Sequence, residues 1–493
     1  MIEIISTKAL NFSTDLLVVP IFHGEKNIKI LDKDLKSFLN GSIDLDFFQA
    51  RFGKAILLDY SLIKSIKRIY LLYVGQKNEL DPFALRASFY KLRKMTQEEK
   101  IEHLTVLLRD ELISLLPEDQ VIESIVEGLI FGEYSFKKYK TEQKEVHKIK
   151  KFAFIPPFGH QIKNLKQIEE YIEVATEATN FARDMINEPA CTATPNYLAE
   201  EALKLKNFSN MTVEVWGKKE LEKAKMGGVL AVGRGGEYEP HFVDIRYNPK
   251  GAKKHICIIG KGITFDSGGL DIKTSAGMLT MKIDMSGAAS VLAVMQAIGK
   301  LQPKVRVTGI FAACENLVDS KSYKPGDVIT MHSGKTVEIT NTDAEGRLIL
   351  ADCISYANKL KPDVMLDIAT LTGGAVVALG TQVTAVMTNN DTLAQTIIAL
   401  GKETGESFWQ LPLFKRYRAH IDSHIADMEN TGPREASAII GALFLYEFVD
   451  DSIAWMHLDI AGPAWAEDNC SYFPKGATGC PVRTLLRYIM RQE

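Results

Sequence analysis

The sequence predicts an α/β protein of two domains, a small N-terminal one and a larger C-terminal one with a mostly parallel central sheet. Two observations support this prediction. The chain has 493 residues, more than the roughly 100 to 200 residues of an ordinary domain. Short apolar runs typical of buried strands alternate with stretches of helical periodicity, as in sheets whose strands are connected through helices.

The first 155 residues are expected to form the small domain. Apolar runs at residues 15–22, 54–61, 68–75 and 104–110 indicate strands, and residues 81–95 have helical character. This part of the sequence contains no cluster of side chains with catalytic chemistry, so we expect the domain to be non-catalytic.

A linker and a connecting helix are expected over residues 156–187. The preceding segment, KKYKTEQKEVHKIKK at residues 137–151, is rich in lysine and poor in apolar residues, as suits an exposed connector. The amphipathic pattern over residues 165–187 predicts a long helix, which ends because Pro189 disfavours helical backbone at Glu188.

The remaining residues, 188–493, are expected to form the catalytic domain. Near-continuous apolar runs, suited to strands buried on both faces of a sheet, lie at residues 255–260, 305–313 and 364–370. Helices are expected at residues 286–300 and 346–360. This order of elements places a ligand site at the carboxyl ends of parallel strands, so the loops that leave those ends are the candidates.

Composition disfavours several classes of function. The 59 basic residues nearly balance the 62 acidic ones, so net charge attracts neither nucleic acid nor an anionic membrane. With no leader pattern at its start and no apolar run of about 18 residues, the sequence predicts a cytoplasmic protein. The six cysteines lack CxxC spacing, which disfavours a disulfide framework or a thiolate zinc site. Signatures of nucleotide-binding loops, serine hydrolases and HExxH zinc peptidases are also absent.

Two segments of the larger domain carry unusual charge. The first, GKGITFDSGGLDIKTSAGMLTMKIDMSG at residues 260–287, follows a predicted strand and contains Lys261, Asp266, Lys273 and Asp284. The second, NTDAEGRL at residues 341–348, has Asp343, Glu345 and Arg347 at every second position. In a strand this spacing puts the three side chains on one side, whereas in a solvated turn it has no special meaning. The sequence alone leaves both interpretations open.

Together the two segments supply four carboxylates. If these meet, they repel one another and cannot all stay ionised unless cations are supplied. Two divalent metals with lysine and arginine nearby would satisfy this need, and oxygen-rich ligation suits zinc, manganese, cobalt or magnesium. Paired metals activate water and polarise a carbonyl, so these residues favour metal-assisted hydrolysis.

The segments KGITFDSGGLDIK, MKIDMSGAASV and NTDAEGRL resemble the signature blocks of the leucyl aminopeptidase family, the cytosol aminopeptidases. Further similarity runs through ARDMINEPACTATP, YKPGDVI, DIATLTGG and HLDIAGPAW. The resemblance implies a metal-dependent aminopeptidase that hydrolyses the N-terminal residue, preferably leucine or another apolar residue, from peptides with a free N-terminus. It also implies two metal ions per subunit, zinc or manganese, and a homo-hexamer.

The resemblance assigns roles to residues by motif position. It implies five metal ligands: Lys261, Asp266, Asp284, Asp343 and Glu345. Asp266 and Glu345 would contact both metals, Lys261 and Asp284 the more tightly held one, and Asp343 the exchangeable one. A lysine ligand must be neutral, which requires a strongly lowered pKa that burial beside dications can supply.

Two cations are assigned to catalysis instead. Lys273 would stabilise the oxyanion of the tetrahedral intermediate, and Arg347 would hold a bicarbonate that acts as general base. The pocket for the first side chain would be lined by Met281, Thr370, Gly373 and Ala461. The less favoured alternative for Met281 and Ala461 is that they are plain core residues. Ala464 stands where larger residues occur in the family, which indicates a roomier pocket and weakens the expected preference for leucine.

Alternatives of other kinds are kept open. Some members of the family bind DNA as architectural factors, and Lys148, Lys150 and Lys151 offer a basic segment, although the balanced charge makes nucleic acid an unlikely partner. An inactive scaffold is disfavoured because every implied ligand is present. His332 and His457 are expected to have structural roles.

Overall fold

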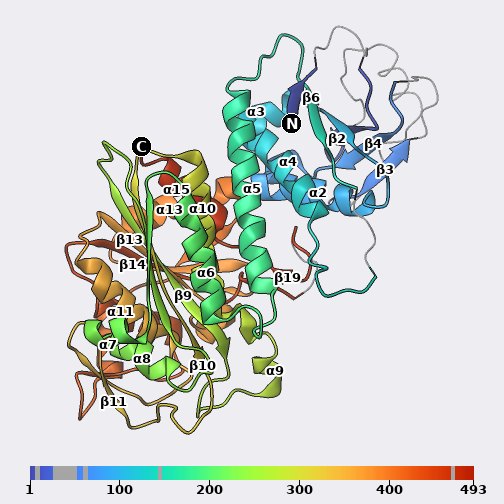
Figure 1. Cartoon of the computed structure of the whole chain (residues 1–493). Helices are drawn as coiled ribbons and strands as arrows, with labels where there is room; N and C mark the ends of the chain where they lie inside the picture. The colour runs from blue at the N-terminus through green and yellow to red at the C-terminus, as the bar shows by residue number, and fades with distance from the viewer. Residues whose placement is uncertain (6–11, 26–52, 59–64, 143–146, 468–471) are drawn as a thin grey trace. The chain divides into compact units, whose positions relative to one another are not determined.

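The computed structural model describes residues 1–5, 12–25, 53–58, 65–142, 147–467 and 472–493 (Figure 1). The chain divides into two compact units, of which the first comprises Met1–Thr176, Lys402–Gly405 and Asp468–Pro474. The second comprises Glu177–Gly401, Glu406–Glu467 and Lys475–Glu493. Among the described residues, none of the helices combines the length and the apolar character that a bilayer span requires.

The first unit contains a six-stranded sheet with the strand order β1-β6-β5-β2-β4-β3. Its strands are β1 (Ile2–Ile4), β2 (Leu16–Ile21), β3 (Ala55–Leu58), β4 (Ile69–Tyr73), β5 (His103–Leu107) and β6 (Lys151–Ile155). All neighbours pair in parallel except β3 and β4. The sequence predicted β2 to β5, but it gave no strand at β1 or β6, which pair with each other at the edge of the sheet.

Helices α2 (Pro82–Met95), α3 (Asp110–Leu115) and α4 (Glu118–Glu133) accompany this sheet. The predicted helix over 81–95 is confirmed, and its start has a clear local cause. Asp81 caps α2 by accepting a hydrogen bond from Ala84 N at 2.7 Å, and Pro82 fills the first helical position, where no amide donor is needed.

The second unit contains an eight-stranded sheet with the order β15-β14-β17-β13-β9-β10-β8-β7. The four central strands, β17 (Ala454–Asp459), β13 (Val364–Ala369), β9 (His255–Asp266) and β10 (Arg306–Asn316), are mutually parallel. The outer strands are β7 (Met211–Trp216), β8 (His241–Tyr247), β14 (Val383–Thr388) and β15 (Ser407–Gln410). The predicted apolar strands are therefore confirmed as the centre of a mostly parallel sheet.

Small strands complete this unit: β11 (Val328–Thr330), β12 (Thr336–Glu338), β16 (Met428–Glu429), β18 (Trp465–Ala466) and β19 (Gly476–Ala477). Its helices begin with α5 (Leu165–Asn187), which starts in the first unit and confirms the helix predicted over residues 165–187. The others are α6 (Pro195–Lys204), α7 (Lys218–Ala224), α8 (Gly227–Gly233), α9 (Ser275–Met278), α10 (Ser286–Leu301), α11 (Gly346–Asn358), α12 (Gly373–Leu379), α13 (Asp391–Thr404), α14 (Ser437–Tyr446) and α15 (Val482–Met490). Short 3-10 helices lie at Leu205–Asn207 (η3), Met281–Met285 (η4) and Lys415–Ile421 (η5).

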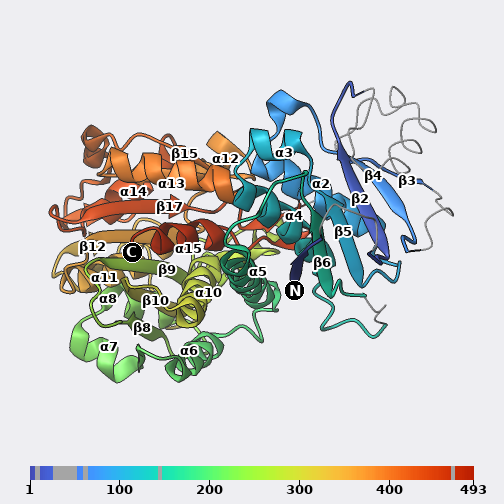
Figure 2. The same ribbon diagram turned by 90° about the horizontal axis from the view of Figure 1, so that it is seen from above.

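Helices cover both faces of the large sheet (Figure 2). Helices α10 and α15 pack together on one face. Helices α8, α11 and α14 share a buried apolar core with the other face, to which β9 contributes Cys257 and Ile259. The predicted helices over 286–300 and 346–360 are confirmed as α10 and α11.

Glycine allows α10 to lie unusually close to β9. A Cβ at Gly260 would lie 2.5 Å from the backbone carbon of Gly287, and one at Gly287 would lie 2.1 Å from Ile368 O. Only residues without a Cβ permit this approach. As a result, the segments that follow β9 and precede α10 are held at the carboxyl ends of the central strands, where the sequence predicted the site.

Candidate active site

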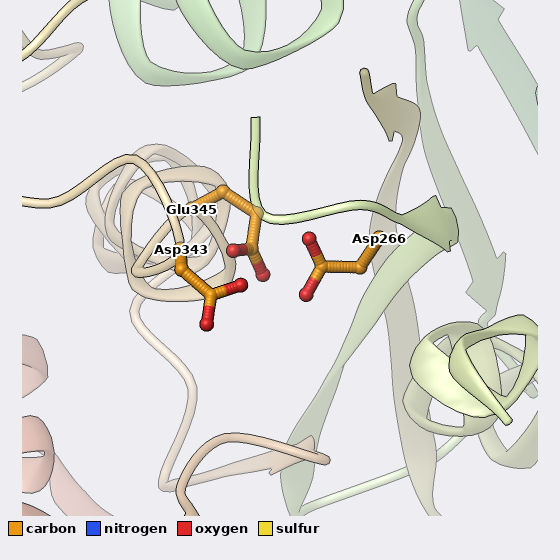
Figure 3. Close-up of side chains that lie close together, drawn as sticks. All are labelled: Asp266, Asp343 and Glu345. Atoms are coloured by element: carbon orange, nitrogen blue, oxygen red, sulfur yellow. The ribbon is translucent and has the colours of Figure 1, made fainter. Parts of the chain in front are cut away.

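The structure brings the charged residues of the two sequence segments together. Asp266 is the last residue of β9, and Asp343 and Glu345 precede α11. Each of the three offers a carboxylate oxygen, and these oxygens all lie within 4.8 Å of one another. Figure 3 shows the three carboxylates facing a common space. The geometry is that of a candidate metal site built from oxygen ligands.

The backbone of NTDAEGRL is a turn that leads into α11, so the strand interpretation of its alternation is wrong. The solvated-turn interpretation is wrong as well, because Glu345 is only 1% exposed. Asp343 lies in the turn, Glu345 is the residue before the helix, and Arg347 belongs to its first turn.

Lys261 lies inside the cluster. Its Nζ is 2.8 Å from Asp284 Oδ2 and 2.8 Å from Glu345 Oε1, and it donates a hydrogen bond to Thr370 O at 3.1 Å. Burial alone would lower the pKa of this ammonium, but the carboxylates of Asp284, Glu345 and Asp266 outweigh burial and raise it. When no metal is bound, Lys261 is therefore a cation that compensates for part of the negative charge.

Lys273 is the second cation of the cluster and lies nearer its edge, with 17% of its side chain exposed. Its Nζ is 2.8 Å from Asp266 Oδ2 and also pairs with Asp343 Oδ1. Burial opposes its charge, but Asp266, Glu345 and Asp343 raise its pKa. Lys273 thus remains charged beside the space that the carboxylates face.

The four carboxylates are under-compensated. Burial, with the neighbouring carboxylates, raises the pKa of Asp284 to about 7 and that of Asp343 to about 6, although the two lysines oppose the shift. Glu345 behaves differently, because Lys261 and Lys273 outweigh burial and lower its pKa. Four buried or half-buried acids facing two ammonium groups leave excess negative charge, which divalent cations would neutralise. The residues therefore fit a pair of divalent metals.

Asn316 is a residue of the site that sequence reasoning missed. It is the last residue of β10, and its Nδ2 donates to Asp266 Oδ1 at 2.9 Å, to Thr342 O at 3.0 Å and to Glu345 Oε2 at 3.3 Å. One buried amide therefore fixes carboxylates from both charged segments. The available signal was a polar residue at the carboxyl end of a buried strand.

Asp271 and Thr342 tie the two charged segments together. Asp271 Oδ2 accepts a hydrogen bond from Thr342 N at 2.7 Å, and Asp271 N donates to Thr342 Oγ1 at 2.8 Å. The Thr342 hydroxyl in turn donates to Gly268 O at 2.6 Å. These bonds explain how loops about 70 residues apart in the chain come to share one site.

Arg347 is buried beside the cluster and borders a pocket of about 320 Å³. It donates to Asn430 O at 2.8 Å and lies over the Phe444 ring, 5.9 Å from its centroid. Burial lowers the pKa of its guanidinium to about 10, against the opposing charges of Glu345 and Asp459, so it is a cation at neutral pH. Its Nε has no hydrogen-bond partner among the described residues, which leaves donor capacity for an anion.

Among the residues implied for the side-chain pocket, Thr370 touches the cluster directly. Its hydroxyl donates to Asp284 Oδ1 at 2.7 Å, and its carbonyl oxygen accepts from Lys261. Gly373 begins α12 and lines the same pocket as Arg347. Met281 begins η4, the short helix that carries Asp284.

Ala461 lies two residues beyond β17 and donates its amide to Asp459 Oδ1 at 3.1 Å. Neither Met281 nor Ala461 is fully buried, which does not favour their interpretation as plain core residues. Ala464, in contrast, is only 1% exposed, and its amide and carbonyl groups are engaged in backbone hydrogen bonds with Ile460 and Thr478.

His332 and His457 form their hydrogen bonds outside the carboxylate cluster. His332 Nδ1 lies 2.7 Å from Ala224 O, and its Nε2 lies 2.7 Å from Lys359 Nζ. His457 Nδ1 pairs with the buried Asp367. Neither imidazole is hydrogen-bonded to the carboxylate cluster, in agreement with the structural roles expected for them.

The structure describes only part of the lysine-rich segment at residues 137–151. Lys150 pairs with Glu102 at 2.9 Å, and Lys151 pairs with Glu3, whereas residues 143–146 lie outside the described part of the chain. Two of the three lysines considered for DNA are therefore already opposite carboxylates.

Comparison with known proteins gives matches along nearly the whole chain. The model for the "Cytosol aminopeptidase family, catalytic domain" matches residues 180–486, and that for the family's N-terminal domain matches residues 18–143. A "Probable cytosol aminopeptidase" of Sulfurihydrogenibium sp. is 39% identical over 498 aligned positions, covering 99% of this chain and 98% of the relative. Its counterpart from Geobacter sp. is also 39% identical and is covered completely.

Solved structures are similar over a comparable length. A mutant of tomato leucine aminopeptidase superposes with a TM-score of 0.86 at 30% identity, covering 99% of this chain and 96% of that one. The bottromycin maturation enzyme BotP in complex with Mn gives a TM-score of 0.83 at 31% identity, with 97% and 100% coverage. These names give no support to the DNA-binding alternative.

Proposed function

Because the chain belongs to the cytosol aminopeptidase family and is a metal-dependent aminopeptidase, we propose that its carboxylate cluster holds two divalent ions and serves to remove apolar N-terminal residues. One observation carries the proposal: four carboxylates and Lys261 converge at the carboxyl ends of the central strands with too little positive charge to neutralise them. All of these residues belong to the second unit, which supports residues 188–493 as the catalytic domain and residues 1–155 as non-catalytic.

The proposed ligands are Lys261, Asp266, Asp284, Asp343 and Glu345. Asp266 and Glu345 would contact both ions, Lys261 and Asp284 one of them, and Asp343 the other. We propose zinc or manganese, because oxygen-rich ligation suits both and because one similar solved structure, that of BotP, is a complex with Mn. When bound, the ions supply a water molecule of lowered pKa and polarise the scissile carbonyl.

The chain's own cations act beside the ions. Lys273 stays charged at the edge of the cluster, where it would donate hydrogen bonds to the carbonyl oxygen of the substrate as negative charge develops there. Arg347 borders the pocket and would hold a bicarbonate that serves as general base for the attacking water.

Met281, Thr370, Gly373 and Ala461 would receive the first side chain of the peptide. The free amine of the peptide is the group that distinguishes an exopeptidase substrate, so an N-acetylated peptide should not be cleaved. The relatives are named cytosol aminopeptidases, and we propose a cytoplasmic location and a homo-hexameric assembly for this chain as well. Sedimentation velocity of the purified protein tests the assembly.

The decisive experiment compares a leucine anilide with its N-acetylated form. The protein is assayed after chelation and again after manganese or zinc is added back, with Glu345→Gln alongside. We expect metal-restored cleavage of the free-amine substrate only, and loss of that cleavage in the variant. Cleavage that is indifferent to metal, or equal on the blocked substrate, would contradict the proposed function.

A further inference from the structure

Asp459 ends β17 and is completely buried. Its carboxylate accepts three hydrogen bonds. Oδ1 accepts from the amides of Leu371 and Ala461, both at 3.1 Å, and Oδ2 accepts from the Thr372 hydroxyl at 2.6 Å. One side chain therefore joins the loop that follows β13 to the loop that follows β17.

The two loops carry most of the proposed side-chain pocket. Thr370 and Gly373 flank the two donors at positions 371 and 372, and Ala461 is itself a donor. The Thr372 hydroxyl has a second task, because it accepts a hydrogen bond from Ala375 N at 3.1 Å and thereby caps α12. The start of α12 therefore depends on the position of the Thr372 hydroxyl, which its hydrogen bond to Asp459 fixes.

The loop held by Asp459 also reaches the metal cluster. Thr370 accepts from Lys261 through its carbonyl oxygen and donates to Asp284 through its hydroxyl. Asp459 is therefore linked to two proposed metal ligands, Lys261 and Asp284, through the backbone and hydrogen bonds of residues 370–372. Displacing the loop would move the wall of the pocket relative to the reacting carbonyl.

We propose that Asp459 is a positioning residue that sets the shape of the side-chain pocket and so determines which N-terminal residues the enzyme prefers. This inference rests on the proposed function of the same site. Asp459 itself would touch no reacting atom. It acts by holding the amides and the hydroxyl that fix Thr370, Gly373 and Ala461.

Asp352 provides a matched control. It is also completely buried, and its carboxylate also accepts amide hydrogen bonds, from Val229 at 3.0 Å and from His332 at 2.7 Å. The segments that it joins, α8 and the turn before β12, carry none of the proposed substrate residues. Removing either carboxylate leaves buried donors unsatisfied and costs stability, but only Asp459 should affect selectivity.

The test compares the wild type with Asp459→Ala, Asp459→Asn and Asp352→Ala. For each protein, kcat and KM are measured on leucine and alanine anilides, and thermal unfolding is recorded. The ratio of the two kcat/KM values is informative because the fraction of folded, metal-loaded enzyme cancels from it. A loss of stability alone therefore leaves the ratio unchanged.

We expect Asp459→Ala to lower the leucine-to-alanine ratio by about tenfold, mainly through KM for leucine, which corresponds to a misplaced pocket wall. Asp459→Asn keeps an oxygen for both amides and should retain most of the ratio. Asp352→Ala should lower the unfolding temperature and leave the ratio at the wild-type value. A wild-type ratio in Asp459→Ala would show that Asp459 is only a structural cap and would overturn the inference.

A second pair of variants decides the matter if Asp459→Ala does not fold. Thr372→Val removes the hydroxyl donor, whereas Thr372→Ser keeps it. The ratio should fall in the valine variant and be preserved in the serine variant, and equal ratios in both would overturn the inference. If the wild type released no N-terminal residue at all, the proposed function would fail, and this inference would fail with it. An active enzyme whose variants keep the wild-type selectivity would overturn the inference alone.

Discussion

The side chain of Lys261 passes so close to Gly346 that a Cβ at position 346 would lie 2.4 Å from Lys261 Cε and 2.6 Å from its Nζ. Gly346 begins α11, directly after the proposed ligand Glu345. In a helix, alanine is normally favoured over glycine by roughly 1 kcal/mol. Here the absent Cβ provides the space in which Lys261 reaches Glu345 and Asp284.

Gly346→Ala should therefore reduce kcat/KM by about 100-fold or more, because a displacement of about 1 Å in a catalytic group is enough for such a loss. Gly217→Ala is the control, since a Cβ there would meet only Glu220 Oε2 at an ordinary 3.6 Å. Steady-state kinetics of both variants check the prediction. Wild-type activity in Gly346→Ala would mean that the position of Lys261 is unimportant.

The two lysines of the cluster should separate metal binding from catalysis. Lys261→Met removes a proposed ligand, so we expect it to retain about one metal fewer per subunit than the wild type. Lys273→Met should keep the full metal content and lose kcat by about 100-fold to 1,000-fold, as for the loss of an oxyanion donor. Elemental analysis after gel filtration, together with kinetics, measures both effects. Loss of metal from Lys273→Met would contradict the assignment.

Much of the fold followed from the sequence because its signals are local. Strands β9, β10 and β13 are buried on both faces and so appear as continuous apolar runs, and α5 is long enough for its periodicity to be unmistakable. The edge strand β1 and its neighbour β6 were missed because three to five residues carry little pattern. Their pairing depends on contacts between distant parts of the chain.

The site was predictable only in part. Its charged residues could be named because charge among glycines after a buried strand is conspicuous, and their roles came from the family resemblance. The residues that organise these charged groups could not be named from the sequence. Asn316, Thr342 and Asp459 act through hydrogen bonds between segments that are distant in the chain. Such bonds leave no periodic trace in the sequence.

Metal loading should expel a proton from Lys261. Before metal binds, the carboxylates hold the pKa of Lys261 above its usual value, yet a lysine that binds a metal must be neutral. At pH 8.5 the carboxyls of Asp284 and Asp343, with pKa values of about 7 and about 6, are largely ionised already and contribute little. Burial and Glu345 also raise the pKa of Asp266, but this carboxyl is present in both the wild type and Lys261→Met, so its contribution cancels when the two are compared. Metal affinity should therefore rise about tenfold per pH unit through this one proton.

Calorimetric titration of the chelated protein with zinc in buffers of different ionisation enthalpy counts the protons released. Lys261→Met is the control. It should bind the ion that Lys261 contacts too weakly to retain it through gel filtration, so it is titrated to zinc concentrations that fill the site, where it should release one proton fewer than the wild type. Equal proton counts in the two proteins would show that Lys261 does not bind metal as the neutral amine.

Asp352 should make the unfolding free energy depend on pH in a way that does not involve the metals. Burial raises its pKa to about 7, against hydrogen bonds from the amides of His332, Val229 and Gly228. Because the folded chain holds this proton more tightly than the unfolded chain, its contribution to stability is complete below about pH 4 and is lost as pH rises to about 7. Asp352→Asn removes that loss.

Between about pH 4 and 7, Asp352→Asn should therefore become steadily more stable relative to the wild type. The difference in the free energy of unfolding should grow by at most about 1.4 kcal/mol per pH unit and stay constant at higher pH. Urea unfolding at a series of pH values measures this difference, from which the titration of the metal cluster cancels. Asp319→Asn is the control, since the amide of Lys321 and the Ser320 hydroxyl lower the pKa of that exposed carboxyl, and it should show no such slope. Parallel curves for Asp352→Asn and wild type would mean that Asp352 is ionised throughout and that its amide donors, not burial, set its charge.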